Sequence, residues 1–237
     1  REIHHPNEIA QNQAHNCSEH SGANIWMHNN FLIDRAGKMS KSSGEFLRLK
    51  VLIDKGFHPL AYRLMCLQAH YRSELEFSWD NLAAALTRLK RIVMGIERLV
   101  EKAEAKSAAI DHPAIRQLRD RFDAALSEDL NSSKCLPILE EMLSLKKLPA
   151  DQRLTLLGEI DDVLGLDLRR LQRSTLRVRP ANATIDEAEI ELMLDRRQQA
   201  KSEKDFATAD AVRDELTAKG IELMDGDALR WDWKIEI

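Results

Sequence analysis

The chain has 237 residues, 43% of them hydrophobic and 31% charged, a composition typical of soluble globular proteins. Its formal net charge of −4 excludes a uniformly basic nucleic-acid binder, although local basic stripes remain compatible with it. No apolar run approaches the roughly 20 residues that span a bilayer, and three distant cysteines do not suit a disulfide scaffold. We therefore expect a cytoplasmic protein that binds no membrane.

The first 58 residues mix histidine, asparagine and glycine with short apolar runs. Two of these runs, Ile25–Met27 and Phe31–Ile33, predict short buried strands. The small polar residues of Ser40–Gly44 predict a loop. Residues 47–53 then predict a short helix that ends near Gly56.

From Pro59 the apolar period becomes helical. Ser78 is a suitable N-cap for a long helix whose apolar stripe runs from Leu82 to Val100. Pro113 suits the first turn of another helix. Ser132 or Ser133 is expected to cap a further helix, and Asp151 the one after it, which stops at Gly165. Amphipathic helices with short connections predict a bundle over residues 59–180.

Five arginines crowd into the end of this region, between residues 169 and 180, and predict an exposed basic linker. A solvated connector without any ligand is an equally good interpretation of such a charge run.

The last segment, residues 181–237, predicts a small separate α+β module. Thr184 with Glu187 is typical of a capping box, and two short helices follow it. Asp225–Gly226 indicates a turn. Strict alternation from Leu229 to Ile237 predicts a half-buried strand, with Trp231 and Trp233 on one face.

The sharpest chemical feature is the lysine loop, Lys38-Met39-Ser40-Lys41-Ser42. Two ammonium groups on a mobile loop can neutralise charge that develops along a triphosphate. Serine hydroxyls and free backbone N–H groups can bind its oxygens. On residue type alone, a plain solvated loop is the more common meaning of such a pentapeptide.

A second feature lies at the start of the chain, where His4 and Glu8 can share one helical face across Pro6 and reach one metal ion. Imidazole and carboxylate are acceptable zinc ligands, but a tetrahedral site needs more of them. His15, Cys17 and His20 form a tempting local cluster. Their spacing matches no common zinc module, so a polar surface loop is the favoured interpretation of these three.

Together these features resemble the cysteinyl-tRNA synthetases, a class I synthetase family, in order along the whole chain. The lysine loop is identical to the KMSKS signature of class I enzymes. The other resembling stretches are His4–Gln11, Trp26–His28, Tyr62–Leu64, His70–Ser73, Phe77–Ser78, Ala200–Leu216, Gly220–Ile221 and Asp225–Trp231.

The resemblance implies a cysteine–tRNA ligase that activates L-cysteine with ATP and Mg²⁺ and transfers it to the cysteine tRNA. His4 and Glu8 would be two of four Zn²⁺ ligands, and the metal would bind the substrate thiolate. Lys41 would contact the ATP phosphates, assisted by Lys38 and Ser40. Trp26 and His28 would lie near the cysteine pocket.

The resemblance also implies a mainly α fold with three parts. Residues 1–58 would be the end of a Rossmann-type catalytic domain, residues 59–180 a helical tRNA-binding bundle with its linker, and residues 181–237 an anticodon-binding module. We expect a monomer. The residues expected to contact tRNA are Arg169, Arg170, Arg173, Lys201, Lys204, Arg213, Arg230 and Trp231, the last by stacking on an unpaired base or, alternatively, as core.

Departures from the family pattern are equally informative. The HIGH-type element and two cysteine ligands of the metal are absent, and Glu128–Ser133 replaces the acidic run and FNTP of the family. We therefore expect this chain to be a C-terminal portion that is inactive alone. Two alternatives are a non-catalytic tRNA-binding fragment or paralogue and a mycothiol-type cysteine ligase. Residues 183–237 argue against the second.

Overall fold

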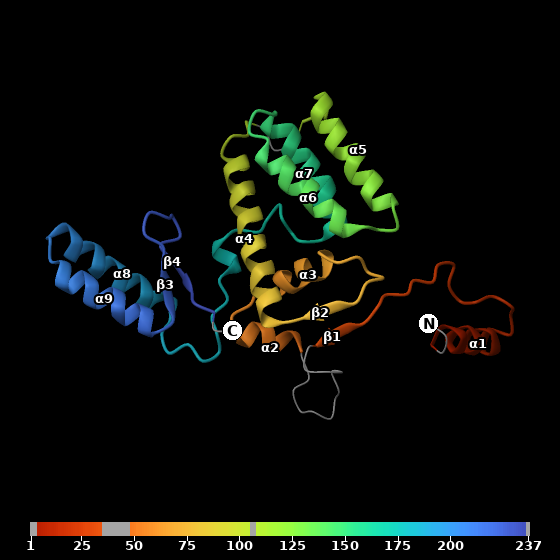
Figure 1. Cartoon of the computed structure of the whole chain (residues 1–237), viewed down its shortest axis with the longest axis horizontal. Helices are drawn as coiled ribbons and strands as arrows, with labels where there is room; N and C mark the ends of the chain where they lie inside the picture. The colour runs from red at the N-terminus through yellow and green to blue at the C-terminus, as the bar shows by residue number, and fades with distance from the viewer. Residues whose placement is uncertain (1–3, 35–47, 105–107, 236–237) are drawn as a thin grey trace.

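The computed structural model describes residues 4–34, 48–104 and 108–235, and these form a mainly α protein, as predicted (Figure 1). The lysine loop lies outside the described residues. In chain order the elements are α1 (His4–Asn16), β1 (Leu32–Asp34), α2 (Leu49–Asp54), α3 (Pro59–Leu67), β2 (Leu75–Phe77), α4 (Trp79–Val100), α5 (Pro113–Ser127), α6 (Ser132–Ser144), α7 (Ala150–Leu164), the 3-10 turn η2 (Ser174–Leu176), α8 (Glu187–Ser202), α9 (Phe206–Ala218), β3 (Ile221–Leu223) and β4 (Trp231–Trp233).

A small parallel sheet joins β1 to β2, with Leu32 opposite Leu75. The strand predicted at Phe31–Ile33 is therefore confirmed within one residue, but it is not buried as predicted, because Phe31 is 76% and Ile33 39% exposed. The second predicted strand, Ile25–Met27, is not a strand. The sequence analysis missed β2, because three residues are too few to show an alternation. Below this sheet, α2, α3 and the start of α4 share one apolar core, which includes Leu52, Phe57, Phe77, Leu82 and Leu86.

The bundle begins with α4, whose N-cap is Ser78 as predicted: its hydroxyl accepts a hydrogen bond of 3.1 Å from the Asn81 amide. The predicted stripe is buried from Leu82 to Ile96, but Val100 is 55% exposed at the helix end. A large core then unites α3 to α7.

Two predicted caps of this bundle are wrong. The N-cap residue of α6 is Asn131 and not Ser132 or Ser133, and the Asn131 side chain makes no capping hydrogen bond. Asp151 lies inside the first turn of α7, which follows Pro149. The predicted stop at Gly165 is confirmed, with a φ of +61°. A Cβ there would lie 2.8 Å from Nη2 of Arg63, whose Nε donates to the Leu164 carbonyl at 2.8 Å.

The C-terminal module has its own core beneath α8, α9 and the antiparallel β3–β4 hairpin. Asp186 and Glu189 form its capping box, so the predicted pair of Thr184 and Glu187 is wrong by two residues. Both pairs have the same spacing, but only Asp186 directly precedes the first helical residue. Gly220 ends α9 with a φ of +81°, as predicted. The predicted half-buried strand is shorter and more buried, because all three residues of β4 are buried.

The linker between bundle and module is the predicted exposed basic segment only in part: Arg169, Arg170 and Arg179 are exposed, whereas Arg173 and Arg177 are half-buried. The side chain of Arg173 is only 16% exposed and donates to two carboxylates, Glu97 of α4 and Asp227 of the hairpin turn, both at 2.8 Å. A second ion pair of 2.5 Å joins Lys90 of α4 to the buried Asp232. These pairs fix the module against α4, on the side of the molecule opposite α1 (Figure 1).

Candidate functional site

Helix α1 presents the two candidate metal ligands. His4 and Glu8 lie one turn apart near its N-terminus, and both are exposed. Pro6 occupies the first turn, as predicted. The helix buries none of its residues, so it offers an open face rather than a closed site.

A hollow of about 590 Å³ opens beside α1, and we call it the histidine hollow. It brings together three of the predicted residues, His4, Trp26 and His28. Between them lies His5, whose Nδ1 is 3.1 Å from Nε2 of His28 and whose ring centroid is 4.7 Å from that of Trp26. The sequence analysis missed His5, although it stands next to a named residue.

The far rim of the histidine hollow is formed by Tyr71 and Arg72, which one carboxylate holds in place. Asp129 accepts hydrogen bonds from the Tyr71 hydroxyl at 2.7 Å and from Arg72 Nη2 at 3.1 Å. The Tyr71 hydrogen bond and the Arg72 charge lower the pKa of the Asp129 carboxyl. Asp129 and Leu130 both have a φ of +56°. The α5–α6 turn thus reaches the rim of this hollow.

The other predicted metal cluster, His15, Cys17 and His20, does not assemble. In the described ranges, no three histidine, cysteine, aspartate or glutamate side chains are grouped to hold a metal ion. Cys17 is exposed, and its thiol points to the Ala14 carbonyl at 3.9 Å. The polar-loop interpretation of these residues therefore fits their placement.

Most residues expected to contact tRNA are already engaged with carboxylates. The pairs are Arg169 with Asp162, Arg173 with Glu97 and Asp227, Lys201 with Asp225, Arg213 with Asp210 and Asp214, and Arg230 with Glu191 and Asp195. Only Arg170 and Lys204 of that set are exposed without such a pair among the described residues. Phosphate binding at the paired positions would compete with a carboxylate that is already in place.

Trp231 is not available for base stacking in this structure. The residue is fully buried, its Nε1 donates to Glu191 at 2.7 Å, and the guanidinium of Arg177 lies 4.2 Å from its ring centroid. The Trp233 ring packs against it at 5.3 Å, edge to face. The alternative that this face is core is therefore the correct one, because both rings fill the space under α8.

The pair of Arg197 and Asp225 predicts a pH-dependent stability of the module. Arg197 donates two hydrogen bonds, of 2.7 and 2.9 Å, and these hold the pKa of the Asp225 carboxyl far below its usual range. A depressed pKa stabilises the fold above the unfolded value of about 3.9 and ceases to do so as the pH falls below it.

We expect Asp225→Asn to lower the free energy of unfolding by about 1 kcal/mol at pH 7, since solvent screens this exposed carboxylate. In urea unfolding, the difference from the wild type should begin to shrink below about pH 4 and should decrease steadily as the pH falls further toward the lowered pKa of Asp225. Ser202→Ala is a matched surface control. A difference that persists unchanged at low pH would show that charge plays no part.

A family model of the class I (C) tRNA synthetase catalytic domain matches residues 3–87. A cysteine–tRNA ligase of Novosphingobium aromaticivorans is 59% identical over 99% of this chain and 49% of its own length. The chain belongs to the cysteine–tRNA ligase family.

Cysteine–tRNA ligases of Zymomonas mobilis and Treponema denticola are 46% and 36% identical, over 100% and 98% of this chain. The chain spans about half the length of the curated relatives it matches. The family and the mainly α fold predicted from the sequence are thus confirmed. Within the described part of the chain, no helix is long and apolar enough to cross a membrane.

Proposed function

We propose that this chain is a C-terminal portion of a cysteine–tRNA ligase, which carries the lysine loop and the tRNA-binding parts. The single observation that carries the proposal is the 59% identity with one such ligase over 99% of the chain. The whole enzyme would activate L-cysteine with ATP and Mg²⁺ and transfer it to the cysteine tRNA. We further propose that it acts in the cytoplasm as a monomer.

Lys38, Met39, Ser40, Lys41 and Ser42 are proposed to bind ATP, with Lys38 and Lys41 as its catalytic contacts. Cationic groups can stabilise the charge that moves to the leaving pyrophosphate as the cysteine carboxylate attacks the α-phosphate. Delivery by a loop allows this stabilisation only when the substrate is bound.

His4 and Glu8 are proposed as two ligands of one zinc ion. Their spacing of four residues on α1 and their exposure leave them free to meet further ligands, as a half-site requires. When bound, zinc would take the cysteine thiolate in preference to a serine hydroxyl. The histidine hollow, with Trp26 and His28, is proposed to form the wall beside the substrate.

We also propose three functional parts with boundaries near residues 58 and 180. The C-terminal part has an independent core, which supports its treatment as an anticodon-binding module. Arg169, Arg170, Lys201, Lys204, Arg213 and Arg230 remain proposed contacts for the tRNA backbone.

A chimera tests the function directly. The 237 residues alone are expected to bind cysteine tRNA but to catalyse no cysteine-dependent exchange between ATP and pyrophosphate. The same residues, joined to the part of the Novosphingobium enzyme that they do not span, should restore exchange and aminoacylation. Robust exchange by the chain alone would contradict its inactivity. A folded chimera that binds tRNA without exchange would favour a non-catalytic tRNA-binding paralogue.

A further inference from the structure

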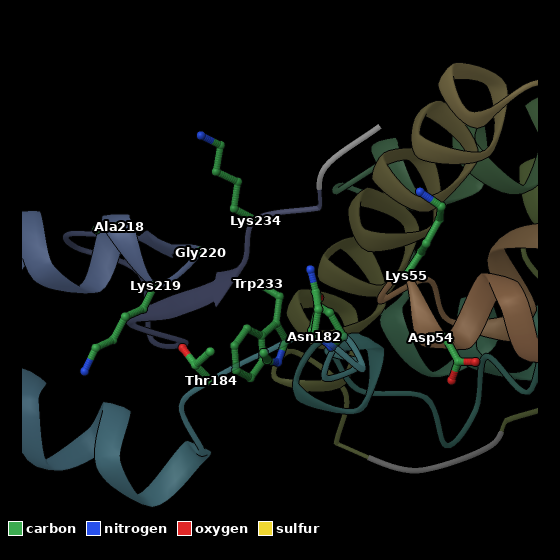
Figure 2. A pocket seen from close by; sticks show the side chains of 11 residues that line it. Asp54, Lys55, Asn182, Thr184, Ala218, Lys219, Gly220, Trp233 and Lys234 are labelled. Atoms are coloured by element: carbon green, nitrogen blue, oxygen red, sulfur yellow. The ribbon is translucent and has the colours of Figure 1, made fainter.

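A second hollow, of about 310 Å³, lies where the C-terminal module meets the end of α2, and we call it the lysine hollow (Figure 2). The chain from Pro180 to Thr184, the end of α9 and the end of β4 contribute to its wall. The Ala181 amide donates to the Asp54 carbonyl at 2.8 Å, which holds the two parts together at its floor. The proposed function uses none of its residues.

Positive charge predominates around the lysine hollow. Lys55, Lys219 and Lys234 line it, with Asp54 as the one acidic lining residue among those described. Asp54 is already paired with Lys50 at 2.9 Å, and Lys219 is paired with Glu215 at 2.9 Å.

Two of these lysines differ from most of the arginines and lysines discussed above. Among the described residues, neither Lys55 nor Lys234 is paired with a carboxylate. Nζ of Lys55 instead lies 4.8 Å from the ring centroid of Trp79, a contact that positions the charge without neutralising it. An anion can therefore bind here without displacing a carboxylate.

The indole N–H of Trp233 is a second observation, independent of the lysines, that points to a ligand in the lysine hollow. Its ring lines the lysine hollow and the residue is only 4% exposed, yet its Nε1 donates to no acceptor in the described part of the chain. Buried indole N–H groups usually have a partner, because an unpaired buried donor is unfavourable. In Figure 2 the polar side chains of Asn182 and Thr184 appear on either side of this ring.

The directions of the lysines indicate which anion fits. Figure 2 shows Lys55, Lys219 and Lys234 pointing in different directions around the hollow rather than toward one point. A single small anion is held best by groups that converge on it, whereas an extended polyanion can meet diverging cations with successive phosphates. Single-stranded or looped RNA presents such a series of charges.

We propose that the lysine hollow binds the phosphate backbone of RNA, with Lys55 and Lys234 neutralising adjacent phosphates and the Trp233 indole donating to one of their oxygens. This inference rests on the proposed function, in which the RNA is the cysteine tRNA. It places a backbone contact at the joint between α2 and the module, so that bound RNA would bridge the two parts.

Titration of the 237-residue chain with fluorescent cysteine tRNA, from about 50 to 300 mM salt, tests the proposal. Lys55→Ala with Lys234→Ala should weaken binding about tenfold and reduce the slope of log K against log salt by about 0.7 to 0.9 per lysine. Lys134→Ala removes one lysine charge from α6, half of what the double variant removes, and should change binding less than about twofold. A double variant that behaves like the Lys134 control would overturn the inference.

Trp233→Phe keeps an aromatic ring and removes the donor, so it should weaken tRNA binding about two- to threefold. Because Phe is smaller than this buried Trp, we expect a lower melting temperature, and binding is compared well below that transition. An unchanged affinity for tRNA would show that the Trp233 indole does not contact the bound RNA. Inorganic phosphate is the second probe, followed through the amide shift of Lys234: saturation below about 1 mM would indicate a small-anion site and contradict the RNA assignment.

The two proposals fail in different ways. Binding that depends on Lys55 and Lys234 but does not prefer the cysteine tRNA over another tRNA would support the lysine hollow and contradict the proposed function. Binding that prefers the cysteine tRNA but does not depend on these lysines would support the proposed function and contradict the lysine hollow as an RNA site.

Discussion

Trp231→Ala is expected to destabilise the C-terminal module by about 3–5 kcal/mol, the range measured for large aromatic residues removed from a core. The core cluster of the module contains eight buried apolar residues, and Trp231 is the largest side chain among those with no exposed surface. Its loss would also leave Glu191 without the indole donor and Arg177 without the ring that it covers. Hydrogen exchange should show residues 185–233 losing protection while α4 to α7 keep theirs.

Trp231→Phe is the matched control, because it keeps most of the apolar volume and removes the hydrogen bond to Glu191. We expect a loss of about 1–2 kcal/mol from this variant and tRNA binding close to that of the wild type. A Phe variant of unchanged stability that binds tRNA much more weakly would restore the stacking role and contradict the core assignment.

Lys41→Ala, made in the chimera described above, is expected to lower the rate of ATP–pyrophosphate exchange by about 100- to 1000-fold, which is typical for the loss of one preorganised donor to a developing charge. The affinity for cysteine tRNA should not change, because the loop acts on the triphosphate. Steady-state exchange kinetics with ATP and cysteine, together with tRNA titrations, would measure both quantities.

Lys50→Ala tests the specificity of that effect, since it removes a lysine from the exposed face of α2, where its partner is Asp54. It should leave exchange within about twofold of the parent chimera. Lys41→Arg should recover part of the rate, because the charge is kept while its geometry differs. An Ala variant with full activity would remove the lysine loop from the proposed mechanism.

The fold was predictable where a local signal decided it. Ser78 caps α4 because its hydroxyl meets an amide three residues on, and Gly165 ends α7 because only glycine fits beside Arg63 at a positive φ. The stripe from Leu82 to Ile96 has the helical period, which requires no tertiary information. Errors arose where two nearby residues were equally good N-cap candidates, as Thr184 and Asp186 were for α8.

The candidate site was predictable only through motifs. His4, Trp26 and His28 belong to stretches that resemble one family, and the structure brings them to one hollow. Asp129 carries no motif of its own, and His5 was not named as a site residue although it belongs to the His4–Gln11 stretch. Their roles follow from contacts that join residues far apart in the chain, such as Asp129 with Tyr71.

By itself, the sequence determined the family and the helical bundle, because periodicity, caps and ordered motifs are local properties of the chain. Only the tertiary structure decided which charges are free. Arg173 and Arg230 were expected to face RNA, yet folding places carboxylates within hydrogen-bonding distance of both. Nothing in the sequence pointed to Lys55 or Lys234, yet folding places them beside a buried indole donor and, among the residues that the structure describes, without a carboxylate partner. Electrostatic pairing depends on distances across the fold, and composition cannot reveal those distances.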